Sequence, residues 1–217
     1  WMQKITGKPY QDEKLIEGIR NECLSTSYMT KIALLNRAIP APLTETMYYS
    51  LFSLVNFVRH RKETVEFFRM AYDEISHHVE NQIGALATER CRILHEGVHI
   101  LFAPHLYQIP KKYGAVFIPG PFVMGLGSNF ERQPDGSWKE RELPDKRGRP
   151  LKTREDALRW LADWYLNNVH FQSQGLEIRL KDMVFVAEEW HANGVAFHFD
   201  HGCVGLSAAM PEQKLAL

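Results

Sequence analysis

The chain has 217 residues, which is enough to bury a sizeable core as one domain or two small ones. Its 26 Lys and Arg residues equal its 26 Asp and Glu residues, so no net charge marks it as a general binder of polyanions. Its three cysteines, Cys23, Cys91 and Cys203, are too few and scattered for a disulfide framework or a cysteine-rich zinc module. No apolar run is long enough to span a bilayer, so we expect a soluble cytoplasmic protein with no membrane partner.

The N-terminal part of the sequence has apolar residues at helical spacing. This spacing predicts a helix over residues 11–38, interrupted at residues 25–27 and ended by the prolines that follow. A second helix is predicted to begin after Thr44, because a threonine side chain is a good N-cap, and to carry an apolar stripe to Val58.

A third helical pattern starts at Glu63. It is expected to break near Gly84, to resume, and to continue to Leu101, where Pro104 soon ends it. The histidine-rich segment of the chain would therefore lie on a helix.

The C-terminal part is richer in glycine, proline and β-branched residues, which favour strands and turns. The predicted strands cover residues 115–118, 122–124, 176–180, 183–187 and 195–199. A hairpin is predicted over residues 129–143 around Pro134-Asp135-Gly136, followed by a helix from about Thr153.

Helices therefore come first, and strands with one helix between them come afterwards. This order predicts an α+β fold, with an N-terminal helical half followed by a mainly antiparallel sheet. We expect a single domain with two lobes, a helical one over about 1–108 and an α+β one over about 112–217.

One segment combines residue types and spacing that suggest chemistry. In it, His95-Glu96-x-x-His99 is followed six residues later by His105. Residues four apart share one face of a helix, so His95 and His99 could bind one metal ion while Glu96 faces a bound water. A zinc hydrolase needs imidazole ligands, an open position for water and a carboxylate that takes the proton of that water.

The motif resembles that of the zincin metallopeptidases, and its spacing is similar to the three-histidine arrangement of metzincins and WLM-type proteases. The resemblance implies His95, His99 and His105 as zinc ligands and Glu96 as the catalytic base. It also implies a metal-dependent hydrolase, most specifically a zinc metallopeptidase with a peptide or protein substrate. Glu131 is an alternative third ligand, and the oligomeric state stays open.

A competing interpretation places His95 and His99 as polar residues at the border of the core, with Arg92 paired to Glu96 at i, i+4. The function would then be that of a non-enzymatic binding or scaffold module. In that module the basic segment 145–154 could contact the phosphates of a nucleic acid.

Two weaker arrangements remain. His198 and Asp200 would share one face of a strand, as metal-binding His-x-Asp motifs do. Cys91 could join them as a thiol nucleophile, although its place on the apolar stripe favours a buried core residue.

Overall fold

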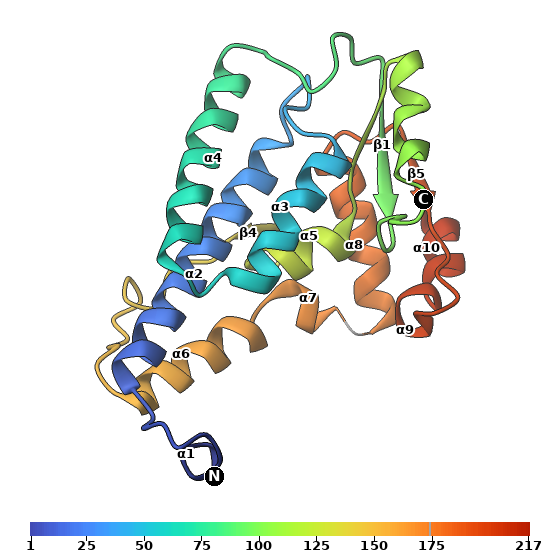
Figure 1. Ribbon diagram of the computed structural model, residues 1–217. Coiled ribbons are helices and arrows are strands. Elements are labelled where there is room, and N and C mark those ends of the chain that lie inside the picture. Colours follow the sequence, from blue (N-terminus) through green and yellow to red (C-terminus); the bar gives the residue numbers. More distant parts are fainter. Residues whose placement is uncertain (174) are drawn as a thin grey trace.

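The computed structural model describes residues 1–173 and 175–217, apart from the side chain of Met2. Four helices come first along the chain: α1 (Met2–Thr6), α2 (Asp12–Leu35), α3 (Glu45–Val58) and α4 (Lys62–Glu80). Figure 1 shows α2, α3 and α4 side by side, next to a small sheet. None of the helices in the described part of the chain is both long and apolar enough to cross a membrane.

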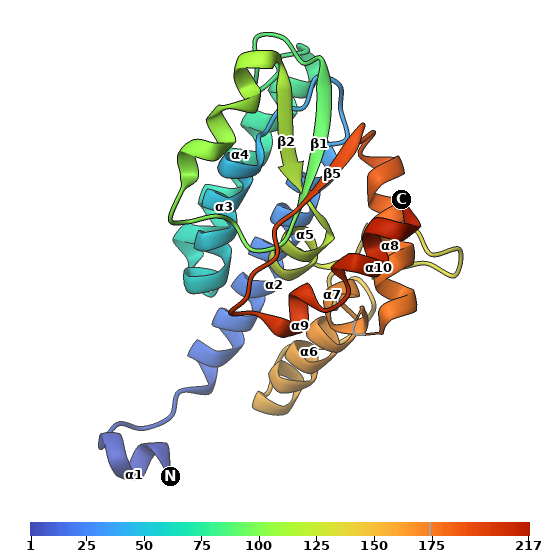
Figure 2. The same ribbon diagram turned by 90° about the vertical axis from the view of Figure 1, so that its right-hand side faces the viewer.

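The central sheet has three parallel strands in the order β2-β1-β5. β1 (Cys91–Glu96) lies in the middle, between β2 (Ala115–Pro119) and β5 (Gly194–Phe197). Figure 2 shows the three strands together, running in the same direction. A separate antiparallel hairpin joins β3 (Phe130–Arg132) to β4 (Trp138–Glu140). The predicted α+β fold class is confirmed, but the main sheet is parallel rather than antiparallel.

The other helical elements connect and cover these strands. They are the 3-10 helices η1 (Pro104–Gln108) and η2 (Pro110–Tyr113) and the α-helices α5 (Pro121–Gly127), α6 (Arg154–Leu166), α7 (Val169–Gln172), α8 (Leu176–Glu189), α9 (Val204–Ser207) and α10 (Met210–Ala216). Parallel strands need long crossovers, and these helices supply them.

The predicted continuation of the third helix to Leu101 is wrong, because residues 91–96 form β1. α4 ends at Glu80, and the chain then enters a turn in which Gln82 has a φ of 55°. A central parallel strand is buried on both faces, so it lacks the polar–apolar alternation that identifies a strand from sequence. Leu94 and its neighbours on β1 therefore fitted a helical pattern equally well.

Three more local predictions are corrected. Residues 25–27 do not interrupt α2, since their hydroxyl groups find partners, as when Thr26 donates to the carbonyl of Glu22 at 2.8 Å. Residues 122–124 lie in α5, and residues 176–187 form one helix, α8, rather than two strands.

The predictions that rest on local capping and turn chemistry are confirmed. The Thr44 side chain accepts a hydrogen bond from the backbone of Met47, and Thr153 forms a capping box with Asp156. The hairpin turn lies at Gly136, as predicted, and Gly136 has a φ of 88°.

One continuous core joins the helical layer to the sheet. Its fully buried members include Met29, Ile32, Tyr48, Phe68, Leu94, Ile118, Met124 and Trp190. A smaller cluster packs the start of α2 against α6 through Cys23, Trp160 and Trp164. The division into lobes at 1–108 and 112–217 stays a prediction.

Arg92 ties β1 to its surroundings. Its side chain is 2% exposed and pairs with Glu89 at 2.8 Å, not with Glu96 as the competing interpretation required. The remaining N–H groups donate to backbone carbonyls, including those of Ala38 at 2.6 Å and Trp190 at 2.9 Å. A single buried guanidinium thus joins the segment after α2, the end of α8 and the central strand.

Candidate functional site

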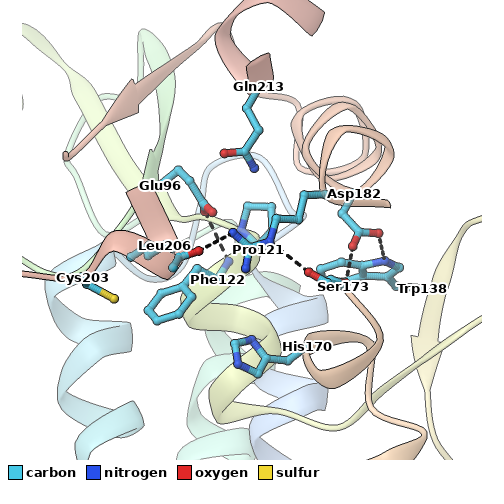
Figure 3. Close-up of a pocket in the computed structure, with 12 residues that line it drawn as sticks. Glu96, Pro121, Phe122, Trp138, His170, Ser173, Asp182, Cys203, Leu206 and Gln213 are labelled. Carbon is cyan, nitrogen blue, oxygen red and sulfur yellow. Dashed lines mark hydrogen bonds between the residues drawn. The ribbon is translucent and has the colours of Figure 1, made fainter. Parts of the chain in front are cut away.

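A cavity of about 220 Å³ lies at the carboxyl edge of the parallel sheet. Its wall includes Glu96 at the end of β1, Pro121 just after β2 and Cys203 beyond β5. Parallel strands all end at the same edge, and this edge is where α/β proteins commonly bind their ligands. Figure 3 shows that side chains from the helical C-terminal region, such as His170 and Gln213, complete the wall.

Glu96 is the acidic group at the centre of this arrangement. Its side chain is 4% exposed, and its carboxyl accepts a hydrogen bond from the backbone N–H of Phe122 at 3.2 Å. Among the described residues no lysine or arginine forms an ion pair with it. Burial raises the pKa of Glu96 from 4.5 to about 7, against the smaller opposing effects of the Phe122 N–H and the Arg179 charge. The carboxyl can therefore give or take a proton near neutral pH.

Gly120 makes this position of Glu96 possible. Its N–H donates to the carbonyl of His95 at 2.8 Å, and a Cβ there would lie 2.6 Å from that oxygen and overlap the Glu96 carboxyl. Only glycine lets the chain after β2 approach the end of β1 so closely.

Asp182 also lines the cavity, but its charge is already balanced. Asp182 is 2% exposed, and its carboxylate accepts hydrogen bonds from Trp138 Nε1 at 3.0 Å, from the Ser173 hydroxyl and from the Arg132 guanidinium. We interpret this group as a structural anchor between α8 and the hairpin, not as a free acid.

Two basic side chains lie on the cavity wall. Arg179, in the first turn of α8, donates to the backbone carbonyls of Ser173 at 3.0 Å and Gly205 at 2.7 Å. Burial, together with the charge of Arg179, lowers the pKa of His170 below 6.5. The imidazole of His170 is therefore neutral at neutral pH.

The histidines of the predicted metal motif lie elsewhere. His95 Nδ1 is 3.3 Å from Glu45 Oε1, and His99 Nδ1 is 2.7 Å from Glu45 Oε2. The ring of His99 stacks between the rings of Tyr49 and Tyr107, at centroid distances of 4.5 Å and 4.3 Å. Burial opposes ionisation of Glu45, but hydrogen bonds from the two histidines outweigh it and lower its pKa. The three groups form a buried polar cluster that attaches the loop after β1 to the start of α3.

The predicted geometry of the metal site is wrong, because the motif lies on a strand and not on a helix. Neighbours on a strand point to opposite faces, so Glu96 faces the cavity while His95 faces Glu45. His105 is exposed on η1. Within residues 1–173 and 175–217, no three His, Cys, Asp or Glu side chains are placed to hold a metal ion.

The structure does not support the alternative metal ligand or the predicted nucleic-acid contact either. Glu131, the other suggested ligand, pairs with Arg147 at 2.5 Å. Two further arginines of the basic segment 145–154 are also paired, Arg149 with Asp163 and Arg154 with Asp12. The positive charge of this segment is thus largely neutralised, and the nucleic-acid alternative finds no support.

The thiol-nucleophile arrangement is not formed either. Cys91 begins β1, whereas His198 follows the far end of β5 and its Nδ1 lies 2.7 Å from the carbonyl oxygen of Val98.

Sequence reasoning missed Arg179, Asp182, His170 and Gln213. The first two are three residues apart, a spacing that places them on one side of a helix. Interpreting residues 176–187 as strands concealed this signal. His170 and Gln213 carry no spacing signal, since only the tertiary fold brings α7 and α10 to β1.

The comparisons with known proteins identify the family. The family model described as 2-hydroxyglutaryl-CoA dehydratase, D-component, matches residues 1–217. No curated protein matched the chain. The finding overturns the predicted zincin metallopeptidase and hydrolase, because the family is one of dehydratases, which are lyases. The zinc prediction is wrong as well, since these dehydratases typically use iron–sulfur cofactors. The chain belongs to the 2-hydroxyglutaryl-CoA dehydratase D-component family.

Proposed function

We propose that this chain binds a 2-hydroxyacyl thioester in the cavity beside Glu96 and moves the protons needed for loss of water. The observation that carries the proposal is a buried carboxyl at the carboxyl edge of the sheet, with a pKa of about 7. The family description names a dehydratase of such a thioester. A carboxyl with a pKa near the working pH is well suited to acid–base catalysis.

Dehydration breaks one C–O bond and one C–H bond and forms a carbon–carbon double bond. The protonated Glu96 carboxyl donates its proton to the departing hydroxyl group, which leaves as water. The neutral imidazole of His170 accepts the proton released from carbon, and transfer of that proton back to Glu96 restores the starting state. The apolar side chains of Phe122 and Leu206 limit the water around the reacting atoms.

The iron–sulfur cluster with which the family is associated does not fit the cysteines of this chain. A cluster needs several thiolates at one place. Cys23 is buried on α2 against α6, and Cys91 begins the strand that Glu96 ends, about 16 Å away at 3.3 Å per residue. Of the cysteines in the described part of the chain, only Cys203 lines the cavity. We therefore assign binding and proton transfer alone to this chain.

The substitution Glu96→Gln tests the proposal. The protein is isolated in the absence of oxygen through an affinity tag on this chain, so that any proteins bound to it are isolated with it. It is then incubated with 2-hydroxyglutaryl-CoA. Loss of one water is followed by mass spectrometry. We expect Glu96→Gln to lower kcat about 100-fold, because the amide cannot donate the proton, and to change KM little.

The matched control is Glu155→Gln, a change of the same chemistry at an exposed position of α6. It should retain the wild-type rate. Full activity of Glu96→Gln, or a wild-type protein that never dehydrates the thioester, would contradict the proposed function.

A further inference from the structure

A group of apolar side chains is exposed on the segment that joins β1 to β2. Tyr107 attaches this segment to the core, since it is buried and its hydroxyl accepts a hydrogen bond from the backbone N–H of Ile100 at 3.0 Å. Figure 2 shows the light-green turns of η1 and η2 beside β2, on the side away from β1. Five large apolar side chains, which we call the 101–113 surface, are between 41% and 84% exposed: Leu101, Phe102, Leu106, Ile109 and Tyr113.

Positive charge adjoins the 101–113 surface. Lys111 and Lys112 lie on η2, and Arg90 lies next to the end of η2, where its backbone N–H donates to the carbonyl of Gly114 at 2.8 Å. Within the described part of the chain none of these three bases forms an ion pair. Residues 97–130 include no Asp or Glu. The positive charge of this region is therefore not neutralised by its own segment.

The helix next to this segment contributes no exposed acid either. α3 meets η1 where the rings of Tyr49 and Tyr107 stack on the ring of His99. The one acidic residue in the sequence of α3, Glu45, is completely buried and faces His95 and His99. The 101–113 surface thus combines exposed apolar groups with neighbouring positive charge.

We infer that the 101–113 surface docks this chain on a membrane whose surface carries anionic lipids. Apolar side chains next to lysines suit the lipid–water interface, because the apolar groups enter the acyl region while the amino groups stay among the lipid phosphates. Tyrosine is enriched at this interface, and Tyr113 directly follows Lys112. A second copy of the chain fits the surface less well, since a symmetric contact brings the same cations together.

Docking of this kind is peripheral and needs no helix that spans the bilayer. No membrane partner was expected, but that expectation rested only on the lack of an apolar run long enough to span a bilayer. No residue of the 101–113 surface lines the cavity beside Glu96, so the inference is independent of the proposed function.

Co-sedimentation with lipid vesicles tests the inference. The purified chain is mixed with vesicles of phosphatidylcholine alone, or of phosphatidylcholine with about one-third phosphatidylserine. We expect about 100-fold tighter binding to the anionic vesicles, because each of the three bases near an anionic surface contributes roughly fivefold. Raising the salt concentration from about 0.1 M to about 0.5 M should remove most of this preference.

Two double variants separate the electrostatic contribution from the apolar one. Lys111→Gln with Lys112→Gln should weaken binding to the anionic vesicles about 30-fold. Leu101→Ser with Phe102→Ser should weaken it at least about tenfold, through the loss of apolar area that the membrane buries. Circular dichroism checks that both variants keep the wild-type fold.

Three controls make the outcome specific. Phe67→Ser with Met70→Ser changes two exposed apolar residues of α4, and Lys14→Gln with Arg20→Gln removes two exposed bases of α2. Both double variants should bind the anionic vesicles as the wild type does. Glu96→Gln should also bind them fully even though it loses dehydration, so this inference and the proposed function can fail separately.

Three results would overturn the inference. The first is a wild-type protein that binds neither kind of vesicle or binds both equally. The second is binding by the variants of the 101–113 surface that equals wild-type binding. The third is a wild-type dimer in sedimentation velocity that Leu101→Ser with Phe102→Ser converts to a monomer, since a second copy of the chain would then cover the surface.

Discussion

Replacement of Arg92 by methionine is expected to lower the free energy of unfolding by about 4 kcal/mol, as breaking a buried ion pair does. Arg92 is 1% exposed, and its guanidinium donates hydrogen bonds to Glu89, Ala38 and Trp190. Methionine fills a similar volume but leaves the Glu89 carboxylate and the carbonyls without these partners. Unfolding in urea, followed by circular dichroism, measures the loss.

Two comparisons separate this effect from a general effect of removing charge. Arg92→Lys keeps a positive charge beside Glu89 but cannot span the same carbonyls, so its loss should be intermediate. Arg159→Met removes an arginine of an exposed i, i+4 pair and should leave the free energy of unfolding nearly unchanged. If the Arg92→Met variant is as stable as the Arg159→Met variant, the hydrogen bonds of Arg92 contribute nothing to the free energy of unfolding.

Glu96→Gln is expected to stabilise the protein at high pH and not at low pH. The pKa of Glu96 is about 7 in the folded protein, against 4.5 for an ordinary glutamate, so the neutral form favours folding. This contribution is fully present below the unfolded-state pKa and is lost as the pH rises through the folded-state pKa. The difference of about 2.5 pKa units corresponds to about 3 kcal/mol.

Because glutamine is neutral at every pH, the gain in unfolding free energy over wild type should grow by about 3 kcal/mol between about pH 4 and pH 9. Urea unfolding at several pH values measures this difference directly. The exposed Glu155→Gln variant corrects for the small effect of removing any carboxyl group. A gain for Glu96→Gln that does not vary with pH would mean that Glu96 ionises as it does in water.

Features set by neighbouring residues could be predicted from the sequence, and features set by distant ones could not. Thr44 and Thr153 cap helices through groups three residues away, and the turn at Gly136 is equally local. The segment with Leu94 was misassigned because a strand buried on both faces has no alternating pattern. The prediction of an α+β class was correct despite this error, because the class depends on the number and order of the elements.

The candidate site shows the same limit. The spacing of His95, Glu96 and His99 marked them as candidate site residues, but the spacing was interpreted as that of a helix, whereas His95 and Glu96 lie on the strand β1. On a strand, Glu96 and His95 face opposite sides, and the two histidines meet Glu45, which lies about fifty residues earlier in the chain. Arg179 could not be connected to Glu96 before the fold was known.

The central claim is that Glu96 keeps its proton near neutral pH inside the cavity. Carbon-13 NMR of glutamate side-chain carboxyl carbons, recorded as a pH titration of the whole protein, tests it most directly. The signal that is absent from Glu96→Gln belongs to Glu96. We predict a titration midpoint of about 7 for that signal. A midpoint near 4.5, the ordinary value for a glutamate, would contradict the account.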